Sequence, residues 1–306
     1  MVESIDRQIA HALQIDGRAP FSRIAEVLEV SEHTVARRYR RLRADGAVRV
    51  AGVLNGVLLG HHSWTIRLRC TPDAGVALAA ALARRPDTYW VHLLSGGTAI
   101  SCYQQVASAD ELLLDKLPRT NRVLDVHAHS VLRGFASPGT WSGLSCLSAA
   151  QVAALRPVAE PAVVEMSEQD HVLVSLLARD GRMGFAELAG RAGTSESTAR
   201  RRVEVLRRSR VLEVLLETDP RAFGYLAEAR LWMSVRPSAL AEVGAALATH
   251  PEVYYAAATT GQANLVASVA CRDSLDLYRY LTERVGALDR VTAVETAPVL
   301  RTVKRT

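Results

Sequence analysis

Two short arginine-rich segments of the sequence could bind a polyanion. Residues 31–46, SEHTVARRYRRLRADG, hold five arginines and one histidine but only two acidic residues. Residues 195–210, SESTARRRVEVLRRSR, hold six arginines and again two acidic residues. Arginine donates in a fork to phosphate oxygens and to guanine edges. One such segment could equally be a solvated surface helix, but its recurrence favours a binding role.

Each arginine-rich segment is predicted to be a helix with one buried face. In the first segment, Val35, Tyr39 and Leu42 recur at helical spacing and make an apolar stripe, and Ser31 is a strong N-cap candidate. Two shorter helical patterns precede this helix, and the alternating residues 48–54, VRVAGVL, predict a small β wing after it. This order of elements is the layout of a winged helix-turn-helix, whose last helix enters the major groove.

The recognition-helix interpretation selects a set of side chains for DNA contact. Residues off the stripe near the helix N-terminus can reach base edges, and arginines further along can reach phosphates. The predicted contacts are His33, Thr34, Arg37, Arg38 and Arg41 in the first segment, and Ser197, Thr198, Arg201, Arg202 and Arg208 in the second. Thr34 and Thr198 lie so near the helix start that we expect them to be partly structural.

The whole chain is a tandem repeat. Asp6-Arg7 matches Asp170-His171, and the offset of 170 − 6 = 164 positions holds without a gap through the arginine-rich segments. A unit of about 130 residues therefore occurs twice. Gly46, which ends the first segment, corresponds to Arg210, so the second wing is expected to differ from the first.

The second part of each unit has the pattern of a ferredoxin-like domain. In the first copy, residues 63–70, 88–94, 98–106 and 123–132 are strand-like, and residues 77–85 and 109–117 are helical. The order is βαββαβ, and residues 227–300 repeat it. The fold class is therefore α+β, with a winged helix-turn-helix and a ferredoxin-like domain in each copy. The predicted domains are 1–55 and 60–134, a linker at 135–166 with a short helix around 149–155, then 167–218 and 224–306.

The sequence resembles the Lrp/AsnC family of bacterial and archaeal transcription regulators. The resemblance is carried by I-D, by D-G-R, by the S-x-x-T-V-x-R-R helix and by the βαββαβ order, which is similar to the family's RAM sensing domain. It covers nearly all of both repeats and implies double-stranded DNA as a partner. It also implies a small effector, amino-acid-like, near the interface of the sensing domains. Two fused units could form the pseudo-twofold dimer within one chain, or they could pair between chains as a homo-oligomer.

The family's effector loop resembles T-G-x-x-D-L, and the two copies depart from it differently. Copy two has Thr260, Gly261, Gln262 and then Asn264 in place of the aspartate. Copy one has Ser95, Gly96 and Gly97, without a polar group at the matching place. The resemblance thus implies an effector site built mainly from copy two, where a neutral asparagine binds an ammonium without charge assistance, or a ligand that is not a standard amino acid. Two plain β-turns are the alternative.

Composition and the remaining residues argue against several other classes. A net charge of +5 and a pI of about 9.2 fit a nucleic-acid partner. Apolar runs such as ALAAALA are too short to cross a bilayer, and the N-terminus is unlike a signal peptide, so we expect a cytoplasmic protein without a membrane partner. The four scattered cysteines form no CxxC pair, which predicts reduced thiols and no metal site. We expect no cofactor.

Two alternatives to a DNA-binding regulator remain. Siroheme decarboxylases resemble the same architecture and would be expected to pair histidine and arginine after the first sensing helix, where this chain has His92 in copy one and alanine in copy two. A sensor without DNA binding is the other alternative, and the retained Arg37, Arg38, Arg201 and Arg202 argue against it. Neither repeat contains a Ser-His-Asp set, a P-loop or paired carboxylates, so we expect that the protein is not an enzyme.

Overall fold

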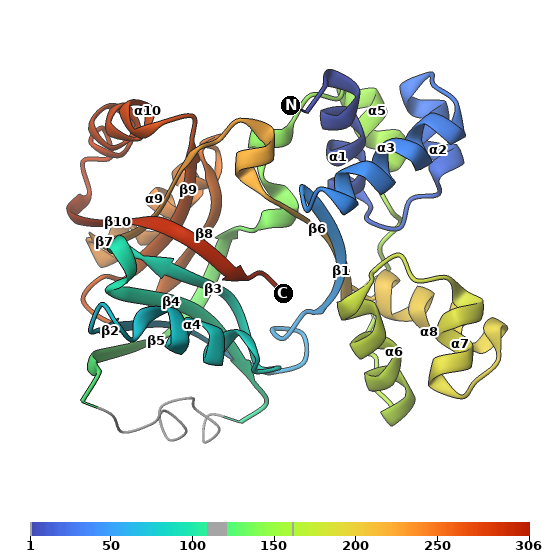
Figure 1. Cartoon of the computed structure of the whole chain (residues 1–306), viewed down its shortest axis with the longest axis horizontal. Coiled ribbons are helices and arrows are strands. Elements are labelled where there is room, and N and C mark those ends of the chain that lie inside the picture. The colour runs from blue at the N-terminus through green and yellow to red at the C-terminus, as the bar shows by residue number, and fades with distance from the viewer. Residues whose placement is uncertain (1, 109–120, 161) are drawn as a thin grey trace. The chain divides into compact units, whose positions relative to one another are not determined.

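The computed structural model describes residues 2–108, 121–160 and 162–306. The chain divides into two compact units, and each unit combines the corresponding parts of both repeats (Figure 1). The helical unit contains Met1–Leu59, Pro138–Thr140 and Leu144–Phe223, and the sheet unit contains Gly60–Ser137, Trp141–Gly143 and Gly224–Thr306. The predicted α+β class is confirmed, and like domains of the two copies are brought together.

Three helices form each head of the helical unit. The first head has α1 (Ser4–Ile15), α2 (Phe21–Leu28) and α3 (Glu32–Ala44), and the second has α6 (Glu168–Arg179), α7 (Phe185–Ala192) and α8 (Glu196–Arg208). Ser31 and Ser195 are the N-caps of the third helices, because each hydroxyl accepts the N–H of the residue three positions further on, at 3.1 Å. The predicted apolar stripe is the buried face: Val35, Tyr39 and Leu42 are at most 5% exposed.

The strand after each third helix pairs with its counterpart from the other copy. β1 (Val48–Leu54) and β6 (Leu212–Thr218) form a two-stranded antiparallel sheet. Ala51 lies opposite Leu215, its own equivalent in the repeat, so a pseudo-twofold axis passes through the middle of this sheet. The strand predicted as a wing is therefore present in both copies, but its partner comes from the other head. This pairing satisfies backbone groups that a lone strand would leave open.

The second head keeps this geometry without the glycine that ends α3. Gly46 has a φ of 69° and Arg210 a φ of 63°, so both take the left-handed conformation that ends a helix. A side chain in this conformation costs on the order of 1 kcal/mol. β6 nevertheless pairs over the same seven residues as β1. The difference expected between the two wings is not observed.

A reciprocal pair of arginines joins the two heads. Arg18 donates to two backbone carbonyls of the second head and Arg182 to two of the first, at 2.7–3.1 Å. The Arg18 guanidinium lies 4.7 Å from the ring centre of Phe185, and that of Arg182 lies 4.2 Å from the ring centre of Phe21. Burial, followed by the charges of Arg207 and Arg182, lowers the pKa of Arg18 to about 10. The recurring D-G-R motif thus holds the heads together.

The aspartate of each D-G-R motif also binds the other head. Arg43 contacts Asp180 at 2.9 Å, and its equivalent Arg207 contacts Asp16 at 2.5 Å. These ion pairs lie at the ends of α3 and α8, next to the arginine forks. Both heads therefore use the same three side-chain types for the same contact.

The segment predicted as a linker packs on the first head. Its helix α5 (Ala149–Leu155) has the predicted bounds and begins with a capping box between Ser148 and Gln151. The Gln151 amide donates to the carbonyl of Val27 at 2.9 Å, and Leu155 is fully buried. His11 accepts the N–H groups of residues 146 and 147 at 3.1 Å, and burial lowers its pKa. The part of this connection from residue 144 to residue 160 thus belongs to the helical unit.

The sheet unit contains both ferredoxin-like domains. The first has β2 (His62–Cys70), α4 (Gly75–Ala83), β3 (Thr88–Leu94), β4 (Ala99–Val106) and β5 (Val123–Ala136). The second has β7 (Ala227–Val235), α9 (Leu240–Ala248), β8 (Val253–Thr259), β9 (Leu265–Cys271), α10 (Ser274–Arg279), a π-helical segment (Tyr280–Val285) and β10 (Val291–Lys304). The helix predicted at 109–117 lies outside the described residues, and the other elements form where they were predicted.

The eight strands close into one barrel, in the order β10-β3-β4-β2-β5-β8-β9-β7. The two copies meet at two seams, because β5 pairs with β8 and β10 pairs with β3. In each seam the last strand of one copy binds the second strand of the other. A core cluster formed by Leu94 and Ala99 with Trp232 and Val266 packs residues of both copies together. Among the described residues, no helix is long and apolar enough to cross a bilayer.

We predict that Arg182→Ala lowers the free energy of unfolding by about 3 kcal/mol, because two charge-assisted hydrogen bonds between the heads are lost. Arg182→Lys should lower it by roughly 2 kcal/mol, since an ammonium cannot reproduce the planar fork. Urea denaturation followed by circular dichroism measures both changes.

The control is Arg191→Ala, which removes an exposed ion pair with Glu187 on α7. This variant should change the stability by less than about 0.5 kcal/mol. Equal effects of Arg182→Ala and Arg191→Ala would contradict the role assigned to the fork.

Candidate nucleic-acid interface

The helices α3 and α8 each present one unpaired arginine at the same position of the repeat. Arg37 and Arg201 are exposed and make no hydrogen bond or ion pair with any residue that the structure describes. Each lies two residues after the buried stripe residue that follows the N-cap, Val35 or Ala199, and so points away from the core. Both side chains are therefore available to a polyanion.

The arginine next to each unpaired arginine is held inside its own head. In the first head, Arg38 contacts Asp6 at 3.1 Å and Glu3 at 2.9 Å. Arg41 contacts the same carboxylates, with its shortest distance, 2.6 Å, to Asp6. The Asp6 side chain is completely buried, so these contacts supply the positive charge that it needs.

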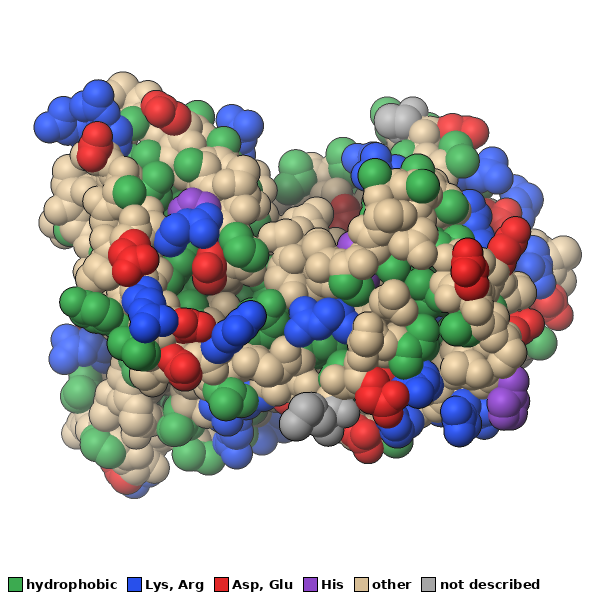
Figure 2. Space-filling view, turned by 90° about the horizontal axis from the view of Figure 1, so that it is seen from above, with side chains coloured by type: hydrophobic (Ala, Val, Ile, Leu, Met, Phe, Trp, Pro, Cys, Tyr) green, Lys and Arg blue, Asp and Glu red, His purple; other side chains and the backbone are tan. Residues whose placement is uncertain are grey.

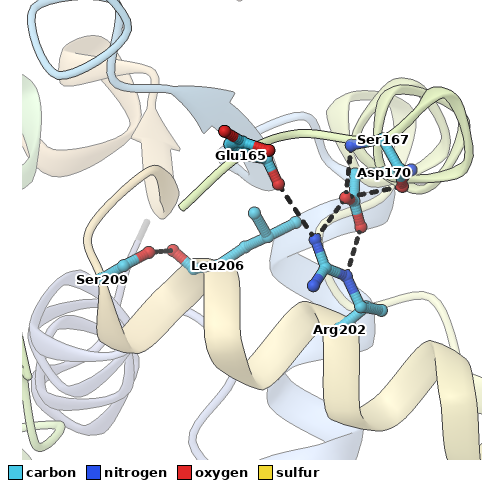
Figure 3. Close-up of polar contacts among 6 residues, drawn as sticks. All are labelled: Glu165, Ser167, Asp170, Arg202, Leu206 and Ser209. Carbon is cyan, nitrogen blue, oxygen red and sulfur yellow. Dashed lines mark hydrogen bonds and ion pairs between the residues drawn. The ribbon is translucent and has the colours of Figure 1, made fainter. Parts of the chain in front are cut away.

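The second head repeats the arrangement with one arginine (Figure 3). Arg202 donates to both oxygens of Asp170, at 2.8 and 2.5 Å, and to the carbonyl of Glu165 at 3.4 Å. Asp170 also accepts the hydroxyl and the N–H of Ser167 at 2.8 Å. Burial by itself would raise the pKa of Asp170, but the hydrogen bonds from Arg202 and Ser167 outweigh it and lower the pKa to about 2.

Arg38 and Arg202 therefore tie α1 to α3 and α6 to α8. We predicted both as DNA contacts, and in the structure both side chains are engaged within the protein. A signal in the sequence could have identified this role. Asp6 and Asp170 recur at the same offset as the two arginines, so both members of the pair are duplicated together. A DNA contact stays a prediction for both arginines, and each would have to make that contact while it keeps its ion pair.

The two predicted threonines belong to the helix caps. The hydroxyls of Thr34 and Ser31 lie 2.9 Å apart, and Ser195 donates to Thr198 at 2.9 Å. Both threonines are half-buried, in keeping with the partly structural role expected for them. His33 and Ser197, one residue earlier on each helix, are exposed. His33 has no hydrogen-bond partner among the described residues, whereas the Ser197 hydroxyl lies 3.0 Å from that of Ser195.

The remaining predicted phosphate contact lies near the end of α8. Arg208 is 56% exposed, and its nearest ion-pair partner among the described residues, Glu160, is 3.9 Å away. Over the part of the chain that carries the helical heads (right in Figure 2), arginine side chains stand among aspartates and glutamates. The positive charge is therefore distributed in single side chains, and their positions matter more than the net charge.

The two helices differ at the positions around the unpaired arginine. Arg40 of α3 corresponds to Glu204 of α8, and both are exposed. Ala36 corresponds to Arg200, which contacts Glu196 at 3.1 Å. The second head thus carries a carboxylate where the first carries a guanidinium.

A cavity of about 420 Å³ lies beside Arg201 in the second head. It is formed where the N-terminus of α6 approaches α8, and its walls include Ser167, Gln169, Thr198 and Arg202. The free N–H groups at the start of a helix favour an anion, and Arg201 adds a full positive charge. Glu165 also lines the cavity, so its walls carry both signs of charge.

The loop predicted to bind an effector in copy two is tied to the barrel. The Asn264 side chain accepts the N–H of Val235 and donates to its carbonyl, both at 2.9 Å. Thr260 pairs with Ser130 through its N–H and its hydroxyl, at 2.9 and 3.0 Å. Both polar atoms of the Asn264 amide are therefore hydrogen-bonded to Val235, and the predicted bond to a ligand would have to replace one of these hydrogen bonds.

The two loops differ in the space beside their glycines. A Cβ atom at Gly261 would lie 2.3 Å from the His129 ring, whereas one at Gly96 would meet no atom within 4 Å. The Gln262 carbonyl accepts the Ser234 hydroxyl, and Ser95 and Gly97 form a single 3-10 turn. Among the described residues, no hydrogen bond joins the loop of one copy to the loop of the other. The effector assignment of these residues stays a prediction.

The described residues contain no group of three or more histidine, cysteine, aspartate or glutamate side chains that could hold a metal ion. The four cysteines are free thiols; Cys70, Cys102 and Cys271 are buried and Cys146 is exposed.

Comparison with known proteins gives matches in both repeats. The model of the AsnC-type helix-turn-helix domain matches residues 3–43 and 166–207, and that of the Lrp/AsnC ligand binding domain matches residues 228–306. An uncharacterized HTH-type transcriptional regulator of Pyrococcus abyssi is 32% identical over 149 residues, which are 48% of this chain and 94% of the relative. The HTH-type transcriptional regulator FL11 of Pyrococcus horikoshii is 31% identical over 144 residues, 47% of this chain and 95% of the relative.

One solved structure is similar over almost the whole length. The crystal structure of the siroheme decarboxylase NirDL has a TM-score of 0.65 and 18% sequence identity, and the match covers 98% of this chain and 93% of that one. This likeness is one of fold, and it includes the duplication.

We predict that Asp170→Asn lowers the free energy of unfolding by roughly 3 kcal/mol at pH 7, because Arg202 loses its partner. The pKa of Asp170 is lowered on folding, so the ion pair stabilises the protein above about pH 4 and is lost as the pH falls through about 2. Denaturation at a series of pH values should show the difference between the two proteins shrinking toward low pH. A difference that stays constant down to pH 2.5 would contradict the ionic origin of the effect.

Proposed function

Since the chain belongs to the Lrp/AsnC family, we propose that it is a transcriptional regulator that binds double-stranded DNA through α3 and α8. The observation that carries the proposal is the pair of exposed, unpaired arginines, Arg37 and Arg201, at equivalent positions of two capped helices. A small effector bound by the sheet unit would regulate this binding. The relatives, which each correspond to one repeat, are HTH-type transcriptional regulators.

One chain supplies both reading heads in this proposal. β1 and β6 pair about a pseudo-twofold axis, and the two D-G-R motifs hold each other across it. Twofold-related recognition helices read two half-sites about one helical turn apart. The single chain thus corresponds to the dimer that separate units would form. Further association through the sheet unit is compatible with this arrangement.

The two heads are proposed to read unequal half-sites. Arg40 can donate to phosphates or guanine, whereas Glu204 at the matching position accepts from cytosine and repels phosphates. The residues at the helix start also differ, because His33 of α3 corresponds to the smaller, uncharged Ser197 of α8. An operator for this chain is therefore expected to be an imperfect palindrome, a feature that a symmetric homodimer would not select.

We predict that Arg37→Ala and Arg201→Ala each weaken binding to a specific operator by about 1–3 kcal/mol, because each removes a contact of a recognition helix. The measurement is gel shift and footprinting on the intergenic region upstream of the coding sequence, over a series of salt concentrations. The specific complex should weaken steeply with salt. Neither substitution should change the stability of the fold, since neither side chain has a partner among the described residues.

The neighbouring arginines are matched controls on the same helices. Arg38→Ala and Arg202→Ala should lower the free energy of unfolding by roughly 3 kcal/mol. Unchanged affinity and footprint in Arg37→Ala and Arg201→Ala would show that the recognition helices are wrongly assigned. Absence of binding even to bulk DNA at low salt would overturn DNA binding itself.

A second prediction tests the inequality of the heads. Glu204→Arg gives α8 the side chain that α3 has at this position, and it removes a negative charge from the proposed DNA face. Binding should become tighter, by about tenfold or roughly 1.4 kcal/mol, and the preference between half-sites should become more symmetric. A footprint and affinity equal to those of the natural protein would place Glu204 away from the DNA.

A siroheme-decarboxylase-like enzyme is the second candidate, because the likeness in fold extends over both repeats. His92, the histidine that this alternative would use, is 2% exposed and lies 3.0 Å from the Thr302 hydroxyl. Burial, and then the charges of Arg230 and Arg305, lower its pKa to about 3, so the imidazole is neutral and donates no proton near pH 7. Tetrapyrrole absorbance of the purified protein distinguishes the two candidates.

A further inference from the structure

A cavity of about 390 Å³ in the second ferredoxin-like domain is not used by the proposed DNA interface. It lies where the ends of β8 and β9 meet α10 and the π-helical segment that continues it. Such π-helical insertions are frequent at functional sites. The residues that carry the argument are Glu252, Cys271, Arg272, Asp276, Tyr280 and Arg284. The volume is within the range of small-molecule sites.

The cavity wall contains a carboxylate oxygen that lacks a partner. Oε2 of Glu252 is buried and accepts no hydrogen bond within the described part of the chain. An unsatisfied buried acceptor costs free energy, so a donor from outside the chain would be bound favourably. This unsatisfied acceptor is the first observation that points to a ligand, and the charges around the cavity are the second.

In the first copy, the carboxylate at the equivalent position is hydrogen-bonded by other side chains of the same domain. Asp87 is the equivalent of Glu252, since its carbonyl accepts the N–H of Gln105 just as that of Glu252 accepts the N–H of Ala270. Asp87 binds Arg85 at 2.6 and 2.9 Å and Gln104 at 2.8 Å.

In copy two, neither internal partner is retained. His250 replaces Arg85, and its Nδ1 lies 3.1 Å from the Tyr280 hydroxyl. Val269 replaces Gln104 and belongs to the apolar core. Copy two therefore has the acid without either of the two donors found in copy one.

The rim of the cavity carries positive charges that are not neutralised by ion pairs. Arg272 and Arg284 are exposed and have no ion-pair partner among the residues described, while Arg279 contacts Asp276 at 3.6 Å. The part of the sheet unit that includes α10 (left in Figure 2) shows basic and acidic side chains next to one another. Asp276 and Glu283 also line the cavity, so its mouth carries both signs of charge, including two arginines without an ion-pair partner among the described residues. Deeper in the wall lies the buried carboxylate oxygen of Glu252.

The Cys271 thiol of the wall stays neutral, and so does His250, which contacts the wall residue Tyr280. Burial, and then the charges of Glu252 and Asp276, raises the pKa of the Cys271 thiol to about 12. Burial, and then Arg284, lowers the pKa of His250. Neither group adds a charge near pH 7, so the carboxylates and the arginines decide which ligand fits.

We infer that this cavity binds a small zwitterion whose cationic and acidic groups are separated by several bonds. The cationic group, an ammonium or a guanidinium, donates to Glu252, and the acidic group, a carboxylate or a phosphate, faces Arg272 and Arg284. The charges of the site lie at different depths, so an ω-amino acid or an aminoalkyl phosphate fits better than a compact α-amino acid. That this ligand acts as an effector rests on the proposed function; the binding site itself does not.

The test is isothermal titration of the full chain with 4-aminobutyrate and with 2-aminoethyl phosphate. Butylamine and butyrate, which carry one of the two charges each, are the ligand controls, and alanine is the compact zwitterion. We expect at least one of the two extended zwitterions to bind at least tenfold more tightly than any of the three controls. Which of the two binds more tightly identifies the acidic group.

The variants locate the site. Glu252→Gln and the double variant Arg272→Ala/Arg284→Ala should each weaken ligand binding at least tenfold. Glu252→Asp, which keeps the carboxylate, should retain part of the natural affinity. Glu242→Gln, an exposed carboxylate on α9, is the matched control and should bind like the natural protein. Circular dichroism melting without ligand should show that Glu252→Gln is folded, because the amide has nearly the same size and the replaced Oε2 atom makes no hydrogen bond within the described residues.

Absence of heat with both extended zwitterions would overturn the inference, as would equal affinity of the natural protein and Glu252→Gln. Gel shifts without ligand report on DNA binding separately. Failure of the ligand site would therefore leave the proposed regulator standing, and failure of DNA binding would leave the ligand site standing. A change of DNA affinity on adding the zwitterion would connect the two.

Discussion

Pairing of equivalent surfaces from the two copies is the constraint on which the remaining structure depends. At the pseudo-twofold axis Ala51 faces its own equivalent, Leu215, and on either side Arg18 and Arg182 bind the backbone of the opposite head. A surface that must complement itself tolerates few changes, since each change meets its counterpart twice. This explains why the D-G-R motif is unchanged in a chain whose two copies differ at many other positions.

Arginine has two separate roles on the third helix of each head. Arg38 and Arg202 neutralise a buried aspartate and hold the first helix in place, whereas Arg37 and Arg201 have no internal partner among the described residues. Neighbouring side chains on a helix point about 100° apart, so one position can face α1 or α6 while the next faces solvent. The fold thereby fixes the orientation of each recognition helix with one arginine and leaves the next free to bind.

Duplication within one chain permits the copies to diverge where they do not touch their own equivalents. Glu204 stands where the first head has Arg40, and Glu252 has lost the partners that Asp87 keeps. In a homodimer both sites would change together. In this chain one head and one sensing domain can change alone, so an unequal operator and a single ligand site are both accessible to it.

The local elements could be predicted from the amino-acid sequence. Period and capping residues located the third helices, the strands and the helix of the connecting segment, because these depend on neighbours a few positions away. It also determined the duplication and the family. The pairing of β1 with β6 and the closure of the eight strands into one barrel are seen only in the folded protein, since pairing between segments far apart in the chain leaves no periodic signal. The same holds for the arginines: their exposure on one helix could be predicted, but the division into Asp-bound and unpaired residues depends on α1 and α6, which fold against them from more than thirty positions away.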